Sequence, residues 1–392
     1  MSYKFPLAID SWDTEEKKAI YEVVQTGKLT MGKKVEQFEK KFAEYNQSKY
    51  AIMVNSGSSA NLLMIASLFY SKDQSKKLKK GDEVIVPAVS WSTSYFPLYQ
   101  YGLKIRFVDI DLQTLNYNLE KLENAITNKT RVILAVNLLG NPNDFGKINQ
   151  FISNRNIILL EDNCEALGAE FQNKKTGSIG LLGSSSFYFS HHISTMEGGM
   201  IVTNDEELFH IILCLRAHGW TRNLPAKNQV ENKIKNGSFE ESFNFILPGY
   251  NLRPLEICGA IGVKQLEKFP DFLQHRRNNA EIFKESMKDV DEIITQTEIG
   301  KSSWFGFSMI INPESKLKRS DLVTKLEKRG FECRPIVAGD FTKNKVVKYF
   351  EKDIPSSLEI AQVIDKNGLF IGNHHINMSE TFIELKKVFA KK

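Results

Sequence analysis

The sequence predicts an α/β protein with a mostly parallel central sheet and a smaller C-terminal α/β domain. Three observations lead to this fold class. Helical and strand patterns alternate from about residue 35 to residue 250, as in repeated strand–helix–strand units. Residues 131–138 (RVILAVNL) and 157–160 (IILL) are continuous apolar runs, typical of parallel strands buried on both faces. A chain of 392 residues is also long enough for more than one hydrophobic core.

The expected elements follow one another in a regular order. Val35, Phe38, Phe42 and Tyr45 recur at helical spacing, which predicts a helix over residues 35–45. The later elements are expected as strands at 50–54, 83–86, 105–109, 131–138, 157–160 and 200–203, with an apolar helix over 59–69. After a polar surface loop at 223–241 come a helix over 254–269 and strands at 305–311 and 332–337. We therefore place a large domain at residues 1–255 and a small domain at 256–392.

Composition narrows the class of protein. The net charge of +5 is spread along the chain, and the short basic runs at 76–80 (KKLKK) and 316–319 (KLKR) have few interleaved aromatic residues. They are expected to be solvated faces, so no nucleic-acid partner is expected. No segment has the pattern of a signal peptide or of a membrane span, which predicts a cytoplasmic protein without a membrane partner. The four cysteines form no CxxC pair, which favours free thiols and argues against an iron–sulfur cluster.

A strand that ends in a Gly-Ser turn before a helix, at residues 54–63 (VNSGSSANLL), is a candidate phosphate site. Amide groups at a helix N-terminus attract phosphate, and serine hydroxyls add donors. The candidates are the backbone groups of Gly57, Ser58 and Ser59. Taken alone, the turn fits a plain serine-capped helix equally well, because Gly-Ser turns are common.

An acidic pair and an aromatic residue mark two further segments. Glu161 and Asp162 follow a buried strand, where a charged pair is costly without partners. A role for Asp162 as a helix N-cap is the alternative, but it does not explain the pair. Trp91 lies in VPAVSWSTSYF, and its flat ring suits either stacking on a planar ligand or the core.

Residues 186–200 (SFYFSHHISTMEGGM) contain two adjacent histidines, His191 and His192. Imidazole moves protons near neutral pH. A metal site would require further ligands at suitable spacing, and the segment offers none, so no metal is expected. A tight Glu-Gly-Gly turn leads from this segment into the strand at 200–203.

In the same order along nearly the whole chain, these segments resemble the sugar aminotransferase and dehydratase family, whose members are pyridoxal 5′-phosphate (PLP) enzymes of fold type I, the aspartate aminotransferase-like fold. The resemblance implies that Ser186 and the Gly-Ser turn bind the cofactor's phosphate. It implies that Trp91 stacks on the pyridine ring, that Asp162 binds the ring nitrogen, and that Glu165 lies near the 3-hydroxyl group.

The position of the family's cofactor-binding lysine is occupied by His191. A lysine amine condenses with the PLP aldehyde and later moves protons, whereas imidazole retains only the second capacity. Glu165 and His191 together resemble the 3-dehydratase branch of the family. The resemblance implies a lyase that uses PLP, its amino form pyridoxamine 5′-phosphate (PMP) and L-glutamate. It implies loss of the C3 hydroxyl group from a GDP-linked 4-keto-6-deoxy sugar, GDP-4-keto-6-deoxy-D-mannose, with release of ammonia, as in colitose and O-antigen synthesis.

The resemblance also implies a homodimer with the active site at the interface. Matching segments contain the expected substrate-binding residues His218, Arg222, Asn251, Arg253 and Arg334. Two other functions are weighed. A nucleotide-sugar 4-aminotransferase would require a lysine within reach of the cofactor, and the motif has none. A binding module that has lost catalysis would be expected to lose Asp162 and the phosphate turn as well.

Overall fold

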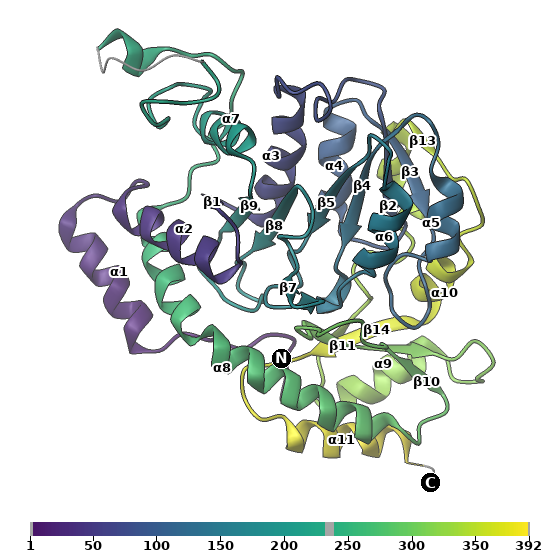
Figure 1. The fold of residues 1–392 in the computed structure, drawn as a ribbon. Helices are drawn as coiled ribbons and strands as arrows, with labels where there is room; N and C mark the ends of the chain where they lie inside the picture. The colour runs from purple at the N-terminus through teal and green to yellow at the C-terminus, as the bar shows by residue number, and fades with distance from the viewer. Residues whose placement is uncertain (1–2, 232–238, 391–392) are drawn as a thin grey trace.

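The computed structural model describes residues 3–231 and 239–390. Its main sheet has eight strands in the order β1-β9-β8-β5-β4-β2-β3-β13 (Figure 1). Neighbouring strands are parallel except where β9 pairs with β1 and β8. The prediction of a mostly parallel central sheet is therefore confirmed. The strands are β1 Tyr50–Val54, β2 Glu83–Pro87, β3 Lys104–Val108, β4 Thr130–Val136, β5 Ile158–Asp162, β8 Leu182–Ser186, β9 Gly199–Thr203 and β13 Lys352–Asp353.

Helices cover both faces of this sheet, which explains the continuous apolar runs. Successive side chains of a strand point to opposite faces. In β2, Val84 and Val86 pack into one core cluster, whereas Ile85 packs into another on the opposite face. The first cluster includes residues of α3 (Gly57–Phe69), α4 (Ser92–Gln100) and α7 (Glu206–Arg216), and the second includes residues of α5 (Leu119–Ala125) and α6 (Phe145–Ile152).

A second sheet of four antiparallel strands has the order β10-β11-β14-β12. Its strands are β10 Ile293–Thr295, β11 Gly306–Ile311, β12 Cys333–Arg334 and β14 Gly368–Gly372. The helices α9 (Arg319–Lys328) and α11 (Ser379–Phe389) share a core cluster with it, at the bottom of Figure 1. The N-terminal segment lies beside this sheet, because Phe5 pairs with Phe331. The boundary near residue 255 remains a proposal.

Helix α8 (Glu256–Met287) runs from one part of the chain to the other (Figure 1). It packs against α1 (Thr14–Thr26) and α2 (Lys33–Tyr45) and also against α11. The predicted end at residue 269 is wrong, because the helix continues through Pro270. A proline inside a helix removes one hydrogen bond, but Phe269, Phe272 and Leu273 around it are all buried. Their burial offsets the lost bond.

The strand predicted over 332–337 is shorter in the structure, because β12 ends at Arg334 and Val337 has a positive φ of 40°. The segment predicted as a loop at 223–241 contains residues 232–238, which lie outside the described residues, and ends in the short helix η2. The chain after α7 extends away from the main sheet at the upper left of Figure 1. The remaining elements are β6 Glu170–Phe171, β7 Lys174–Lys175, α10 Glu359–Asn367, η1 Leu138–Gly140, η2 Glu240–Phe243, η3 Phe341–Lys343 and η4 Lys345–Tyr349.

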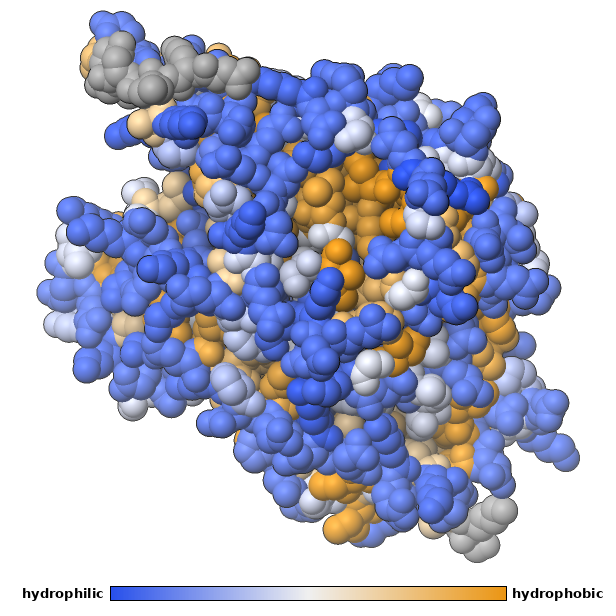
Figure 2. All heavy atoms as spheres, in the orientation of Figure 1, coloured by the Kyte–Doolittle hydropathy of each residue, from blue (hydrophilic) through white to orange (hydrophobic). Residues whose placement is uncertain are grey.

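The face of the molecule seen in Figure 2 is mostly hydrophilic, with hydrophobic residues gathered in a hollow near the central strands. Within residues 3–231 and 239–390, no helix has the length and apolar character needed to cross a membrane.

Candidate active site

The candidate site lies at the edge of the main sheet where its parallel strands end. Strands β1, β2, β5 and β8 end at Val54, Pro87, Asp162 and Ser186. The carboxyl ends of parallel strands lie at the same edge of a sheet, and ligands of such folds bind there. This topology brings together the Gly-Ser turn, Trp91, Asp162 and Ser186, which are far apart in the sequence.

The turn after β1 forms the first part of the site. Ser56 is the N-cap of α3, and its hydroxyl accepts the amide hydrogen of Ser59 at 3.1 Å. The Ser59 hydroxyl donates to Asn55 at 2.6 Å, so both predicted donors of Ser59 already have partners. Gly57 lies against Ser186, because a Cβ atom at Gly57 would come within 2.5 Å of the Cβ of Ser186. The absence of a side chain at Gly57 therefore places Ser186 beside the helix N-terminus.

Asp162 is buried and hydrogen-bonded through both of its carboxylate oxygens. Its side chain is only 6% exposed. One carboxylate oxygen, Oδ2, accepts hydrogen bonds from Asn61 Nδ2 at 2.8 Å and Ser94 Oγ at 2.7 Å. The other, Oδ1, accepts from the amide of Cys164 at 3.2 Å. Asp162 is thus oriented by the helix that starts at the Gly-Ser turn and by the helix that follows Trp91.

Sequence analysis missed Asn61 and Ser94. The signal that could have revealed them is a polar residue inside an otherwise apolar helix, as in SANLLMIASLF. A buried polar side chain in such a position requires a partner. For both residues that partner is Asp162.

Glu161, the neighbour of Asp162, has a structural role. It is fully buried and accepts the amide hydrogens of Gly177, Ile179 and Gly180, each at 2.7 Å. Burial raises its pKa, and these amide hydrogen bonds oppose the rise. The pair that appeared costly in the sequence is therefore satisfied by two separate sets of donors, one for each carboxylate.

Glu165 lies on the segment that follows β5. Its Oε2 atom accepts the amide hydrogen of Leu139 at 3.0 Å. Burial, with a smaller contribution from the charge of Asp162, raises the pKa of Glu165 to about 7. The carboxyl group therefore exchanges a proton near neutral pH, which is the capacity expected of a group that shares a proton with a ligand hydroxyl.

His191 is half-buried in the loop that follows β8. Its ring meets the ring of Phe305 edge-on, with centroids 5.2 Å apart, and Tyr188 lies on another side. Its Nδ1 atom is buried and has no hydrogen-bond partner among the described residues. Burial and the nearby Arg276 cation lower the pKa of His191 to about 4. The imidazole is therefore neutral at physiological pH, the form that accepts a proton.

His192 differs from its neighbour. It is 2% exposed, and its Nε2 atom lies 3.1 Å from the carbonyl oxygen of Ser303. Burial lowers its pKa well below the ordinary value. The buried His192 ring therefore links the loop to the segment before β11. His191 is the more exposed histidine of the pair.

Trp91 is the N-cap of α4 and is 58% exposed. An exposed aromatic ring at the end of a strand becomes buried only when a ligand or another chain covers it. Its ring is therefore available to a planar ligand in this chain, and the core position considered as the alternative is wrong.

Three of the expected substrate-binding residues come together. Arg222, Asn251 and Arg253 line one groove of about 390 Å³. Asn251 Oδ1 accepts from Arg253 Nε at 3.0 Å, which orients the guanidinium group. The amide of Asn55 donates to the carbonyl of Leu252 at 3.1 Å, so the groove adjoins the Gly-Ser turn. The groove is also lined by Thr30, Met31, Trp220, Asn223, Pro254 and Leu255.

The other two expected residues do not line this groove. His218 has a positive φ of 61°, and its amide donates to the carbonyl of Tyr250 at 2.6 Å. It supports the chain beside the groove. Arg334 lies at the end of β12 in the smaller sheet, with its side chain 66% exposed. Across the described ranges, no cluster of His, Cys, Asp and Glu side chains suits a metal ion.

Comparisons with known proteins show the family to which the chain belongs. Residues 10–385 match the DegT/DnrJ/EryC1/StrS aminotransferase family, and the chain belongs to it. The chain is 56% identical over 388 residues to the GDP-4-keto-6-deoxy-D-mannose 3-dehydratase of Yersinia pseudotuberculosis, covering 99% of this chain and 98% of that protein. The fold type I prediction is confirmed by the family and by the solved structures.

Two solved structures are similar over almost their full length. One is the Escherichia coli GDP-4-keto-6-deoxy-D-mannose-3-dehydratase with bound hydrated PLP, with a TM-score of 0.98 and 55% identity, covering all of both chains. The other is a GDP-4-keto-6-deoxymannose-3-dehydratase with a trapped PLP-glutamate geminal diamine. Its TM-score is 0.97 at 55% identity, and 99% of this chain and 100% of that chain are covered.

Proposed function

We propose that this chain is a PLP-dependent nucleotide-sugar 3-dehydratase. It uses L-glutamate as amino donor, removes the C3 hydroxyl group of GDP-4-keto-6-deoxy-D-mannose and releases ammonia. The observation that carries the proposal is a neutral histidine, His191, in the place of the family's lysine, within a cofactor site that otherwise has the expected residues. The 56% identity to a protein of this activity supports the same function.

The residues of the site fit PLP. The helix N-terminus at Gly57 and Ser58, with Ser186 beside it, suits the phosphate group. Asp162 is held in place by Asn61, Ser94 and the amide of Cys164, with the Ser184 hydroxyl 3.5 Å away, so its carboxylate is oriented before the ligand arrives. Trp91 is exposed and suits the face of the ring. When bound, PLP supplies an amine carrier and an electron sink.

His191 acts as the base in this proposal. A lysine would join covalently to the cofactor, whereas an imidazole only accepts and returns protons. Its pKa of about 4 means that the ring is unprotonated throughout the neutral range, so that it has a free nitrogen lone pair that can take up a proton. The same ring then returns a proton to the leaving hydroxyl group. Glu165, with a pKa of about 7, would be the residue that holds or gives up a proton beside the 3-hydroxyl group of a bound cofactor.

The groove beside the Gly-Ser turn suits the nucleotide part of the substrate. Arg222 and Arg253 provide two guanidinium groups, which bind diphosphate oxygens well because of their planar donor geometry. We assign Asn251 to the same groove. His218 and Arg334 lie outside the groove of one chain, so we propose that they act on substrate where two subunits meet.

We propose a homodimer with the site at its interface. Large hydrophobic side chains are exposed around the site, and such residues often mark interfaces. They include Leu29, Trp91, Tyr188, Phe189, Met196, Leu255, Phe243 and Phe245. We also propose the cytoplasm as the location, because all four cysteines are free thiols, as is usual in a reducing compartment.

The test is to incubate the purified chain with PLP, L-glutamate and GDP-4-keto-6-deoxy-D-mannose, and to identify the sugar product by mass spectrometry and NMR. Loss of the C3 oxygen with release of ammonia supports the proposal. A stable 4-amino sugar would support the aminotransferase alternative, which the 56% identity to a dehydratase does not favour. If the PLP absorbance changes with glutamate but the sugar does not react, the substrate is wrong.

A further inference from the structure

The loop that carries His191 is closed at its base and is attached to other elements through His192, which lies 3.1 Å from the carbonyl of Ser303, and through the backbone of Ser194. Phe187 closes the loop: its amide donates to the carbonyl of Gly198 at 2.9 Å, and its carbonyl accepts from the amide of Thr195 at 2.9 Å. Ser194, three residues after His191, provides two further contacts to other elements. Both of its backbone polar groups bind side chains from other elements.

The amide of Ser194 donates to Gln265 Oε1 on α8 at 3.1 Å. Its carbonyl accepts from the indole Nε1 of Trp12, in the N-terminal segment, at 3.1 Å. These two bonds hold the two peptide units that flank the Cα atom of Ser194, one on each side. Because the base of the loop is also closed, they restrict how the loop can turn.

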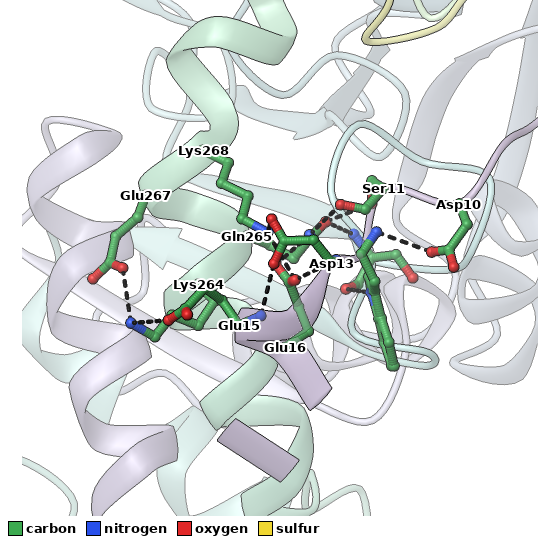
Figure 3. A network of polar contacts seen from close by, with 11 residues as sticks. Asp10, Ser11, Asp13, Glu15, Glu16, Lys264, Gln265, Glu267 and Lys268 are labelled. Atoms are coloured by element: carbon green, nitrogen blue, oxygen red, sulfur yellow. Dashed lines mark hydrogen bonds and ion pairs between the residues drawn. The ribbon is translucent and has the colours of Figure 1, made fainter. Parts of the chain in front are cut away.

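Gln265 is itself fully buried and has a complete set of partners (Figure 3). Its Oε1 atom accepts from the Ser11 hydroxyl at 2.7 Å as well as from Ser194. Its Nε2 atom donates to the carbonyl of Ser11 at 3.2 Å and to Glu16 Oε1 at 2.8 Å. An amide with all four contacts made cannot rotate without losing several of them.

Glu16 fixes the orientation of this amide. Glu16 is fully buried, and its other oxygen accepts from Lys268 Nζ at 2.7 Å and from the amide of Asp13 at 2.9 Å. A carboxylate only accepts, so the NH₂ group of Gln265 must face it and the Gln265 oxygen must face Ser194. Figure 3 shows the side chains from the N-terminal segment and from α8 pointing toward one another.

We propose that Gln265 is a positioning residue that, together with Trp12, holds the backbone on both sides of Ser194 and thereby orients the His191 ring. The reasoning rests on the proposed function and on the residue that occupies the lysine position. A lysine bonded to its cofactor is positioned by that covalent bond. A histidine has no such bond, so the protein itself must fix its direction. Misplacement of a catalytic group by about 1 Å can cost on the order of 100-fold in rate.

A purely structural role for the same cluster makes a different prediction. Gln265, Glu16 and Lys268 also join α1 to α8, so any of them could matter only for folding. Lys268 offers a matched control, because it binds Glu16 and Asp13 in the same network but has no recorded contact with Ser194. A variant of Lys268 disturbs the network without releasing the loop.

The experiment compares Gln265→Met with Lys268→Met in the holoenzyme. We expect kcat for dehydration to fall about 10-fold or more in Gln265→Met, with KM for the sugar nucleotide and affinity for PLP within about twofold of wild type. Lys268→Met should keep its kcat even if its unfolding midpoint is lower. Trp12→Phe, which removes only the other bond to Ser194, should also lower kcat and serves if Gln265→Met does not fold.

A double variant that exchanges the amide and the carboxylate between positions 265 and 16 tests whether lost kcat can be restored. Gln265→Glu keeps an acceptor oxygen for the Ser194 amide but places its other oxygen against Glu16 and the Ser11 carbonyl, and Glu16→Gln added to it supplies a donor to that oxygen, although the bond to the Ser11 carbonyl stays lost. Recovery of at least half of the lost kcat supports the inference. Two results would overturn this inference while leaving the proposed function intact. One is a wild-type kcat in Gln265→Met, and the other is an equal loss of kcat in Gln265→Met and Lys268→Met. Failure of the wild-type chain to dehydrate the sugar overturns the proposed function and this inference with it.

Discussion

The contact between Gly57 and Ser186 can be tested by adding a single methyl group. In Gly57→Ala, the new Cβ atom would lie 2.5 Å from the Cβ of Ser186, 2.9 Å from its hydroxyl oxygen and 3.0 Å from the sulfur of Cys164. Nonbonded carbon atoms prefer about 3.5–4.0 Å, so Ser186 and the start of α3 must separate by roughly 1 Å. The proposed phosphate site would then lose its geometry.

The size of the effect follows from the bonds involved. A hydrogen bond to a charged group contributes about 1.5–3 kcal/mol, so losing one phosphate contact would weaken PLP binding roughly 10- to 150-fold. Forcing a methyl group into a packed site would also cost about 1–3 kcal/mol of folding stability. We expect Gly57→Ala to remain folded and to bind PLP at least 10-fold more weakly.

The assay is titration of the apo protein with PLP, followed by absorbance, alongside urea denaturation. Gly146→Ala is the control, because Gly146 is exposed, and its added Cβ would meet the Oδ1 atom of Asp144 at 3.2 Å rather than any residue of the proposed phosphate site. That variant should bind PLP normally. A folded Gly57→Ala protein with wild-type affinity for PLP would show that this turn does not hold the phosphate.

Three further predictions concern acid stability, the Glu161 site and the groove. Burial and Arg276 lower the pKa of His374 to about 4, below its value of 6.5 outside the protein, so protons bind the unfolded chain first as the pH falls. The free energy of unfolding should therefore drop by about 2 kcal/mol from this group between pH 7 and pH 5, and denaturation of His374→Asn should lack that part. Glu161→Ala leaves three amides without their acceptor and should cost at least about 3 kcal/mol in urea denaturation, whereas a loss below 1 kcal/mol would contradict the structural role. Arg222→Met should raise KM for the GDP-sugar about 10-fold or more without slowing the reaction of the PLP form with glutamate, and an unchanged KM would remove Arg222 from the nucleotide site.

Much of the main sheet could be predicted because its signals are local. Parallel strands covered on both faces are rich in apolar residues, and β2, which is parallel to both of its neighbours, begins at the predicted Glu83 and ends at Pro87, one residue later than predicted. The continuation of α8 could not be predicted, because Pro270 is a local stop signal and only tertiary packing overrides it. The strand β13 was missed because it has two residues and is defined by pairing with β3, far away in the sequence.

In the candidate site, too, local sequence signals could be predicted and long-range contacts could not. The sequence motifs identified the segments at the strand ends, since each motif is a contiguous run. They did not reveal Asn61 and Ser94 on Asp162, or Gln265 on the His191 loop. These contacts join residues that are 68 to 101 positions apart, and only the fold brings them together.

The most direct test of the central claim is a single-turnover measurement with His191→Asn. The variant is first converted to the PMP form by direct addition of PMP, and GDP-4-keto-6-deoxy-D-mannose is then added. If a neutral His191 is the base, the rate of C3 deoxygenation should fall at least about 100-fold, while binding of PMP and of the sugar nucleotide is retained. Deoxygenation at the wild-type rate would contradict the account, because another group would then move the proton.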